Sequence, residues 1–113
     1  MNVFCVVGQI EQLPSLKETA NGIKTCNVMI KTERAFANSD GEYEMDHILI
    51  EVWRGLAETI ANVAQIDDLI AVKGRVASRK VIKDDRTFYN YAFVAEKIDF
   101  LSSKVKKKLF FNS

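Results

Sequence analysis

The stretch that decides the fold is residues 46–58, which read DHILIEVWRGLAE. Up to Trp53, apolar and polar residues alternate as they do along a strand with one buried face. Directly afterwards, Leu56, Ile60 and Val63 follow at helical spacing for about three turns. The stretch therefore predicts a strand that leads directly into an amphipathic helix.

The end of this strand places the only tryptophan of the chain, Trp53, beside Arg54. A flat ring next to a positive charge suits a nucleic-acid strand, because a base stacked on an aromatic ring contributes about 1–3 kcal/mol and every base has a π-face. A tryptophan that packs in the core at a strand end explains the same residues. This stretch alone leaves both interpretations open.

Composition indicates a single domain. The chain has 113 residues, 48% of them hydrophobic, which is enough for one core and not for a second domain. Its apolar runs are shorter than the ~18 residues that cross a bilayer, and its N-terminus lacks a signal-peptide pattern, so we expect a cytoplasmic protein that does not bind a membrane. Cys5 and Cys26 do not make a disulfide framework or a zinc site, and we expect no metal and no cofactor.

Charge is distributed unevenly along a chain whose formal net charge is +1. Residues 73–86 hold six basic residues against two acidic ones, whereas residues 33–51 hold six acidic residues against one arginine. A basic patch on a near-neutral protein binds phosphates locally, with a shallower salt dependence than a uniformly basic protein shows. A solvated surface of mixed charge is the alternative.

The remaining sequence predicts four more strands, at residues 3–10, 25–34, 69–76 and 88–100. Gly8 interrupts the first of them, where we expect a bend or a bulge. Asn21-Gly22 suits a hairpin, and Asp67-Asp68 suits a polar turn after the helix. This order is that of the OB-fold, an all-β, five-stranded Greek-key barrel, here with one helix between strands 3 and 4.

Short motifs that occur in one order along the chain narrow this assignment. They are Met1-Asn2, Val7-Gly8, Ile10, Pro14, Asn21-Gly22, Arg34, Phe36, Gly41-Glu42, Val52-Trp53-Arg54, Leu56-Ala57-Glu58, Val72-Lys73-Gly74-Arg75-Val76, Val94-Ala95-Glu96 and Phe100-Leu101. With these motifs in this order, the chain resembles the bacterial single-stranded DNA-binding protein family. The resemblance implies an OB-fold domain at residues 1–101 and sets residues 102–113 apart as a basic tail.

By position, the resemblance implies that Trp53 stacks on a base and that Phe36 lies near a second stacking position. His47 stands where the family commonly has an aromatic residue, and an imidazole stacks more weakly. Gln9 replaces a family arginine, and a further family aromatic has no counterpart because Val81-Ile82 follow Arg79-Lys80. We therefore expect fewer stacking contacts than in the family.

The basic hairpin around Lys80 would contact phosphates by charge, which positions a strand without reading its sequence. The candidate DNA-binding residues are Arg34, Phe36, His47, Trp53, Arg54, Lys73, Arg75, Arg79, Lys80, Lys83 and Arg86. Tyr89 and Tyr91 share one face of the last strand, and we expect core or subunit-interface packing for them rather than an extra stacking platform. Core positions are expected for Phe4, Phe88, Phe93 and Phe100.

We expect no enzyme, because the sequence has one histidine, no Gly-rich phosphate loop and no closely spaced catalytic carboxylates. The leading hypothesis is sequence-tolerant binding and protection of single-stranded DNA in replication, recombination or repair, with the homotetramer or homodimer that the resemblance implies. The alternative resembles the primosomal replication proteins: an OB-fold module that joins replication or recombination proteins and binds single-stranded DNA weakly.

The resemblance stops at Leu101. The family typically continues through a flexible linker to an acidic tip that recruits partners, whereas residues 104–108 here hold four lysines, followed by Leu109-Phe110-Phe111. A pocket that receives an acidic tip would repel this tail, so we expect it not to recruit such partners. Phosphate contacts, docking of its apolar end on another subunit or protein, and a frayed terminus all remain open.

Overall fold

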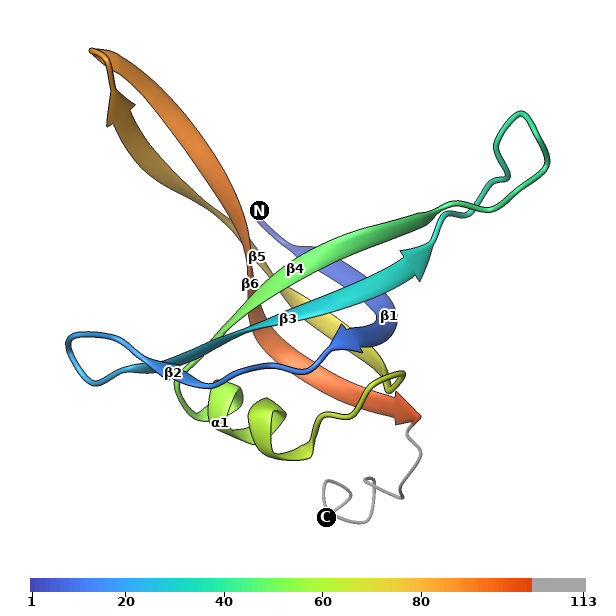
Figure 1. Ribbon diagram of the computed structural model, residues 1–113, viewed down its shortest axis with the longest axis horizontal. Coiled ribbons are helices and arrows are strands. Elements are labelled where there is room, and N and C mark those ends of the chain that lie inside the picture. Colours follow the sequence, from blue (N-terminus) through green and yellow to red (C-terminus); the bar gives the residue numbers. More distant parts are fainter. Residues whose placement is uncertain (103–113) are drawn as a thin grey trace.

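The computed structural model describes residues 1–102, which form strands and one helix (Figure 1). In chain order the elements are β1 (Phe4–Gln12), β2 (Lys17–Glu18), β3 (Lys24–Glu33), β4 (Met45–Trp53), α1 (Arg54–Val63), β5 (Leu69–Lys83) and β6 (Arg86–Ser102). Beyond Ser102, the predicted basic tail lies outside the described residues. Within residues 1–102, no helix is long and apolar enough to cross a membrane.

The strands close into a barrel. The sheet order is β1-β5-β6-β4-β3-β2, and β1 also pairs with β3, so that β1, β5, β6, β4 and β3 form a ring. β4 and β6 run parallel, and the other pairs in the ring are antiparallel. The structure therefore confirms the predicted OB-fold. One detail differs: the short strand β2 adds to the edge of β3, so α1 lies between the fourth and fifth strands of the chain rather than between strands 3 and 4.

Two glycines let strands approach closely. A Cβ atom on Gly8 would lie 2.5 Å from the carbonyl oxygen of Lys31, and one on Gly74 would overlap that of Val94. Gly8 lies where β1 passes from its pairing with β5 to its pairing with β3. The irregularity expected at Gly8 lies slightly later in β1, between Ile10 and Gln12. Gly8 instead allows the close approach of two backbones.

The core fills the barrel with the alternating apolar residues that the sequence indicated. Cys26, Val28 and Ile30 of β3 are buried, as are Ile50 and Val52 of β4. From β5, Ile70 and Val72 join them, and α1 closes the barrel with Ala57 and Ile60. The predicted inner faces of the strands and of the helix are thus confirmed.

The aromatic residues of β6 do not all lie where they were expected. Phe100 is partly buried and packs against the core, and so does Phe4 of β1, as predicted. Phe88 is 49% exposed, so its assignment to the core is wrong. Core packing is wrong for Tyr89 and Tyr91 as well, because both are exposed. The physical reason is that β5 and β6 continue past the barrel, where no other element of residues 1–102 covers the hairpin (Figure 1).

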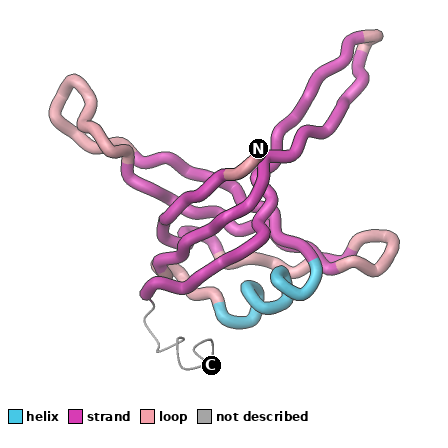
Figure 2. Tube along the Cα trace, turned by 180° about the vertical axis from the view of Figure 1, so that it is seen from behind, coloured by secondary structure: helices cyan, strands magenta, loops and turns pink. Residues whose placement is uncertain are grey.

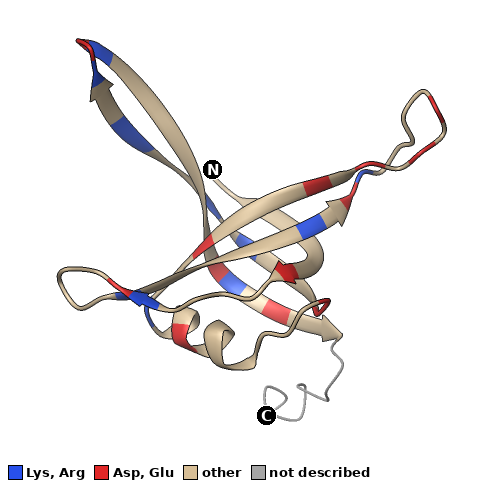
Figure 3. Ribbon diagram, in the orientation of Figure 1, with Lys and Arg blue, Asp and Glu red and all other residues tan. Residues whose placement is uncertain are grey.

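Two segments of opposite charge project from the barrel, the loop between β3 and β4 and the hairpin of β5 and β6, as Figures 1 and 2 show from opposite sides. We call residues 33–46, at the ends of β3 and β4, the acidic arm, and residues 78–91, at the ends of β5 and β6, the basic arm. The acidic arm holds five carboxylates and one arginine, whereas the basic arm holds four basic residues and two aspartates, and Figure 3 shows this separation. Every residue of the basic arm is exposed.

A tight turn ends the basic arm. Its central residues, Asp84 and Asp85, have φ angles of 52° and 60°, and the flanking Lys83 and Arg86 pair with each other. Positive φ at both central residues is the geometry of a type I′ hairpin turn, whose twist matches that of the strands. The turn fixes the register of the whole arm.

Candidate nucleic-acid interface

Trp53 lies at the junction of β4 and α1, where the backbone changes from extended to helical. Its ring is half-buried, and its Nε1 donates a hydrogen bond of 2.6 Å to Oε1 of Glu51. The next residue, Arg54, is exposed and has a φ of 61°, a conformation that L-residues rarely adopt. Trp53 is therefore held in place while part of its ring remains accessible.

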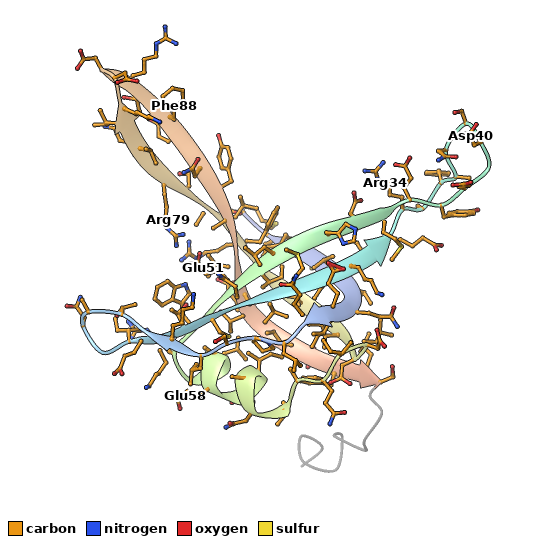
Figure 4. The ribbon with its side chains drawn as sticks, viewed as in Figure 1. Arg34, Asp40, Glu51, Glu58, Arg79 and Phe88 are labelled. Carbon is orange, nitrogen blue, oxygen red and sulfur yellow. The ribbon has the colours of Figure 1, made fainter. Side chains whose placement is uncertain are left out.

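Glu51 also binds Arg79 across the gap between β4 and the basic arm (Figure 4). Nη1 and Nη2 of Arg79 donate to Oε2 and Oε1 of Glu51 over 2.8 and 2.5 Å. These hydrogen bonds from Arg79 lower the pKa of Glu51; burial raises it, and the Trp53 hydrogen bond and the charges of Arg79 and Arg75 lower it further. The pKa of Arg79 is raised by the same pair. Glu51 thus joins Trp53 to the basic arm.

The outward residues of β4 form one continuous face with those of β3. Successive outward positions of β4 are His47, Leu49, Glu51 and Trp53, and they pair with Lys31, Met29, Asn27 and Thr25 of β3. We call these eight residues the outer face. Their alternation with the buried Val52 and Ile50 is what the sequence pattern predicted.

A hollow of about 360 Å³ lies where the outer face meets the base of the basic arm. Its lining includes Asn27, His47, Glu51, Arg79 and Tyr91. His47 is exposed, and its Nδ1 lies 2.9 Å from both carboxylate oxygens of Glu11 on β1. The predicted site residues His47 and Arg79 thus line this hollow, and Glu51, which also lines it, is hydrogen-bonded to the predicted site residue Trp53.

Arg34 and Phe36 lie elsewhere, in the acidic arm. Arg34 donates to Oε2 of Glu44 over 2.6 Å and to Oδ1 of Asp46 over 3.0 Å from two nitrogens. The hydrogen bond to Asp46 and the charges of Asp46 and Glu44 raise the pKa of Arg34. The guanidinium is therefore matched by two carboxylates, and Phe36, 85% exposed, lies in an arm that holds five carboxylates.

Lys73 and Arg75 are both exposed, but β5 carries them to different surroundings. Arg75 lies close enough to Glu51 to lower the pKa of that carboxyl by its charge. Lys73 lines a separate hollow of about 170 Å³ with Val7 of β1 and Lys97 of β6. A register irregularity between Lys73 and Gly74 lies between the two positions. Of this predicted pair, only Arg75 lies near the outer face, where its charge acts on Glu51.

The other three basic residues of the basic arm are Lys80, Lys83 and Arg86. All three are exposed, and none takes part in an ion pair within residues 1–102. Their charges are not matched by a protein carboxylate in this part of the chain. The arrangement is suited to binding phosphate groups.

Sequence reasoning missed the role of Glu51. Its place two residues before Trp53 put it on the same side of a strand, which was visible in the alternation. Its partner Arg79 lies 28 residues away, and only the fold brings the two together. A local pattern gives no signal for such a pair.

Residues 1–101 match the model of the Single-strand binding protein family. The chain is 33% identical over 105 residues to the single-stranded DNA-binding protein of Oceanobacillus iheyensis, which covers 92% of this chain and 65% of the relative. It is 36% identical over 105 residues to single-stranded DNA-binding protein 3 of Listeria innocua, which covers 92% of this chain and 66% of that protein. The chain therefore spans about two thirds of the length of these curated relatives.

Solved structures share the fold. The wild-type single-stranded DNA-binding protein of Thermus aquaticus superposes with a TM-score of 0.78 at 22% identity, covering 92% of this chain and 52% of that one. The Plasmodium falciparum protein in complex with single-stranded DNA gives a TM-score of 0.73 at 17% identity, covering 90% of this chain and 96% of that one. Because the family match extends over residues 1–101, this chain belongs to the Single-strand binding protein family.

Proposed function

We propose that this protein binds and protects single-stranded DNA with little regard to sequence, in the cytoplasm, during replication, recombination or repair. The observation that carries the proposal is the half-buried ring of Trp53, fixed by Glu51 on the outer face and next to Arg79. The names of the curated relatives and the DNA complex of the Plasmodium protein support the same function.

Binding combines stacking with charge. A base stacks on Trp53, and the phosphates on either side lie toward the cations of the outer face and the basic arm. Lys80, Lys83 and Arg86 are not paired with carboxylates in the described chain, so they approach phosphate without first breaking an ion pair. Because none of these contacts reads a base edge, binding tolerates sequence, and no catalytic step is part of this function.

Trp53 makes the test direct, since it is the only tryptophan and reports without interference. We expect titration with an oligothymidylate to quench its fluorescence, and the matched duplex to bind much more weakly because its bases are not available for stacking. Equal affinity for the two DNAs, or binding without quenching, would contradict the proposal. Weak DNA binding together with tight capture of a replication protein would favour the primosomal alternative.

We also propose that the protein self-associates, as a homodimer or homotetramer, through the outward side of β1. Val7 there and Val3, just before the strand, are 48% and 51% exposed, and exposed apolar surface favours contact with a second copy. Light scattering of the parent and of Val7→Glu tests this. We expect the variant to have the lower mass, and equal masses would show that β1 is not the interface.

A further inference from the structure

Phe88 lies on the basic arm with half of its surface exposed, so the core position expected for it does not explain an aromatic residue there. The tight turn at Asp84-Asp85 sets the register, so that Lys83 pairs with Arg86 and Val81 pairs with Phe88. Side chains of paired residues stand on the same face of a ribbon, with Cβ atoms about 4.5–5.5 Å apart. Phe88 and Val81 therefore share one small patch of the arm.

This face of the basic arm also carries three of its four basic residues, Arg79, Lys83 and Arg86, whereas Lys80 lies on the opposite face. Moving from Phe88 toward the barrel, the next pair on the same face is Arg79 with Asn90, and moving toward the tip it is Lys83 with Arg86. The ring thus has basic residues on both sides. The opposite face carries the pairs Ser78 with Tyr91 and Lys80 with Tyr89.

The ion pair between Arg79 and Glu51 shows that the face of the arm with Phe88 and Arg79 is directed toward the outer face. Arg79 reaches Glu51 on the outer face, and Glu51 in turn holds the ring of Trp53. The face with Phe88 is therefore continuous with the surface that carries Trp53. A single strand that leaves Trp53 along this path meets Arg79, then an exposed ring, then two more cations.

We propose that Phe88 is a second stacking position for single-stranded DNA, on the arm-side continuation of the outer face. This inference rests on the proposed function and deepens it. It also changes an expectation from sequence: Val81 lacks the ring that the family resemblance implied there, and the residue paired with it across the ribbon supplies one. An exposed ring flanked by cations is the combination that binds single strands without sequence preference.

The chain offers a matched control. Tyr89 is the next residue on the same strand, is 55% exposed against 49% for Phe88, and stands on the opposite face. We expect Phe88→Ala to weaken oligothymidylate binding about 5- to 30-fold, within the range for removal of one stacked base, and Tyr89→Ala to change it less than about 2-fold. Because both residues are exposed, we expect neither variant to shift the Tm appreciably.

An exchange across the ribbon tests placement rather than mere presence of a ring. We expect Val81→Phe combined with Phe88→Val to restore affinity to within about 3-fold of the parent, since the ring returns to the same patch. In a Trp53→Phe background, Phe88→Trp should be quenched by the oligonucleotide, and Tyr89→Trp should not. Fluorescence quenching reports contact between DNA and position 88 directly, without relying on a change in affinity.

Two results would overturn the inference, and they differ. A parent protein that binds no single strand rejects the proposed function and this inference together. A parent that binds and quenches Trp53, while Phe88→Ala binds as tightly as the parent, rejects Phe88 alone. If Tyr89→Ala then weakens binding, the strand follows the opposite face of the arm.

Discussion

The acidic arm is the loop between β3 and β4, the basic arm is a two-stranded hairpin of β5 and β6, and the two differ in what their charges contact. In the acidic arm, Arg34 is bound by Glu44 and Asp46. At the tip of this arm, Oδ1 of Asn38 accepts hydrogen bonds from the backbone N–H groups of Asp40 and Glu42. In the basic arm, only Arg79 is paired within the described chain, and its partner lies on the outer face. The acidic arm satisfies its own arginine, whereas the basic arm leaves most of its charges for another molecule.

The comparison suggests a path for the DNA. Phosphates are repelled by the carboxylates of one arm and attracted by the cations of the other, so the strand crosses Trp53 and follows the basic arm. The exposed aromatic ring on each arm is then expected to contribute differently to DNA binding. Phe36 extends into a negative field, while Phe88 stands among cations.

The largest expected effect on single-strand affinity is at Trp53, which lies on the outer face. Trp53→Ala should weaken single-strand binding by about 1–3 kcal/mol, because the stacked base loses its partner. Trp53→Phe, which keeps a smaller ring, should lose less. Fluorescence anisotropy with a labelled oligonucleotide measures both, with circular dichroism to show that the variants are folded. Unchanged affinity in folded Trp53→Ala would remove the outer face from the site.

The next effect separates the arms by salt dependence. Lys80→Ala with Lys83→Ala should weaken binding about equally for all sequences and reduce the slope of log K against log salt by roughly 0.7 for each phosphate that the protein no longer neutralises. Arg34→Ala on the acidic arm is the control, and we expect no change in slope because its charge is already bound by carboxylates. Equal slopes for the parent and the lysine variant would mean that the basic arm faces solvent.

Phe36 provides a smaller test. We expect Phe36→Ala to weaken binding by less than about 1 kcal/mol, because a loop ring must also be ordered on binding and its surroundings here are acidic. Neutralising its neighbourhood with Glu42→Gln and Glu44→Gln should raise affinity. A decrease in affinity at Phe36 as large as that at Trp53 would show that DNA also lies along the acidic arm.

The smallest effect concerns stability and Glu51. Its pKa is lowered in the folded state, first by the hydrogen bond from Arg79, so the pair stabilises the protein above the unfolded carboxyl pKa of about 4.3 and loses this contribution as pH falls through the lower folded pKa. Because Arg79 is exposed, Glu51→Gln should cost no more than about 1 kcal/mol at neutral pH. Urea unfolding should show the difference from the parent shrinking below about pH 4. A difference that persists in acid would indicate packing rather than charge.

Much of this molecule follows from local sequence patterns. Alternation along residues 46–53 placed Ile50 and Val52 inside, and helical spacing located α1, because each pattern depends on neighbours in the chain. The exposure of Phe88 could not be read this way, since an apolar strand residue looks the same whether or not another layer covers it. Likewise, the pairing of Glu51 with Arg79 depends on which strands the barrel brings together.

The pairing of β1 has a consequence for how the protein folds as it is synthesised. β1 can pair with β3 early, but its pairing with β5, through Phe4 and Gly74 and through Gln9 and Leu69, waits until more than half of the described chain has emerged. The ring also needs β6, the last strand of the described chain to be made. Long-range pairings of this kind fold slowly, in roughly milliseconds to seconds. We therefore expect the barrel to close only after β6 has left the ribosome, whereas the β2–β3, β1–β3 and β3–β4 pairs are able to form earlier.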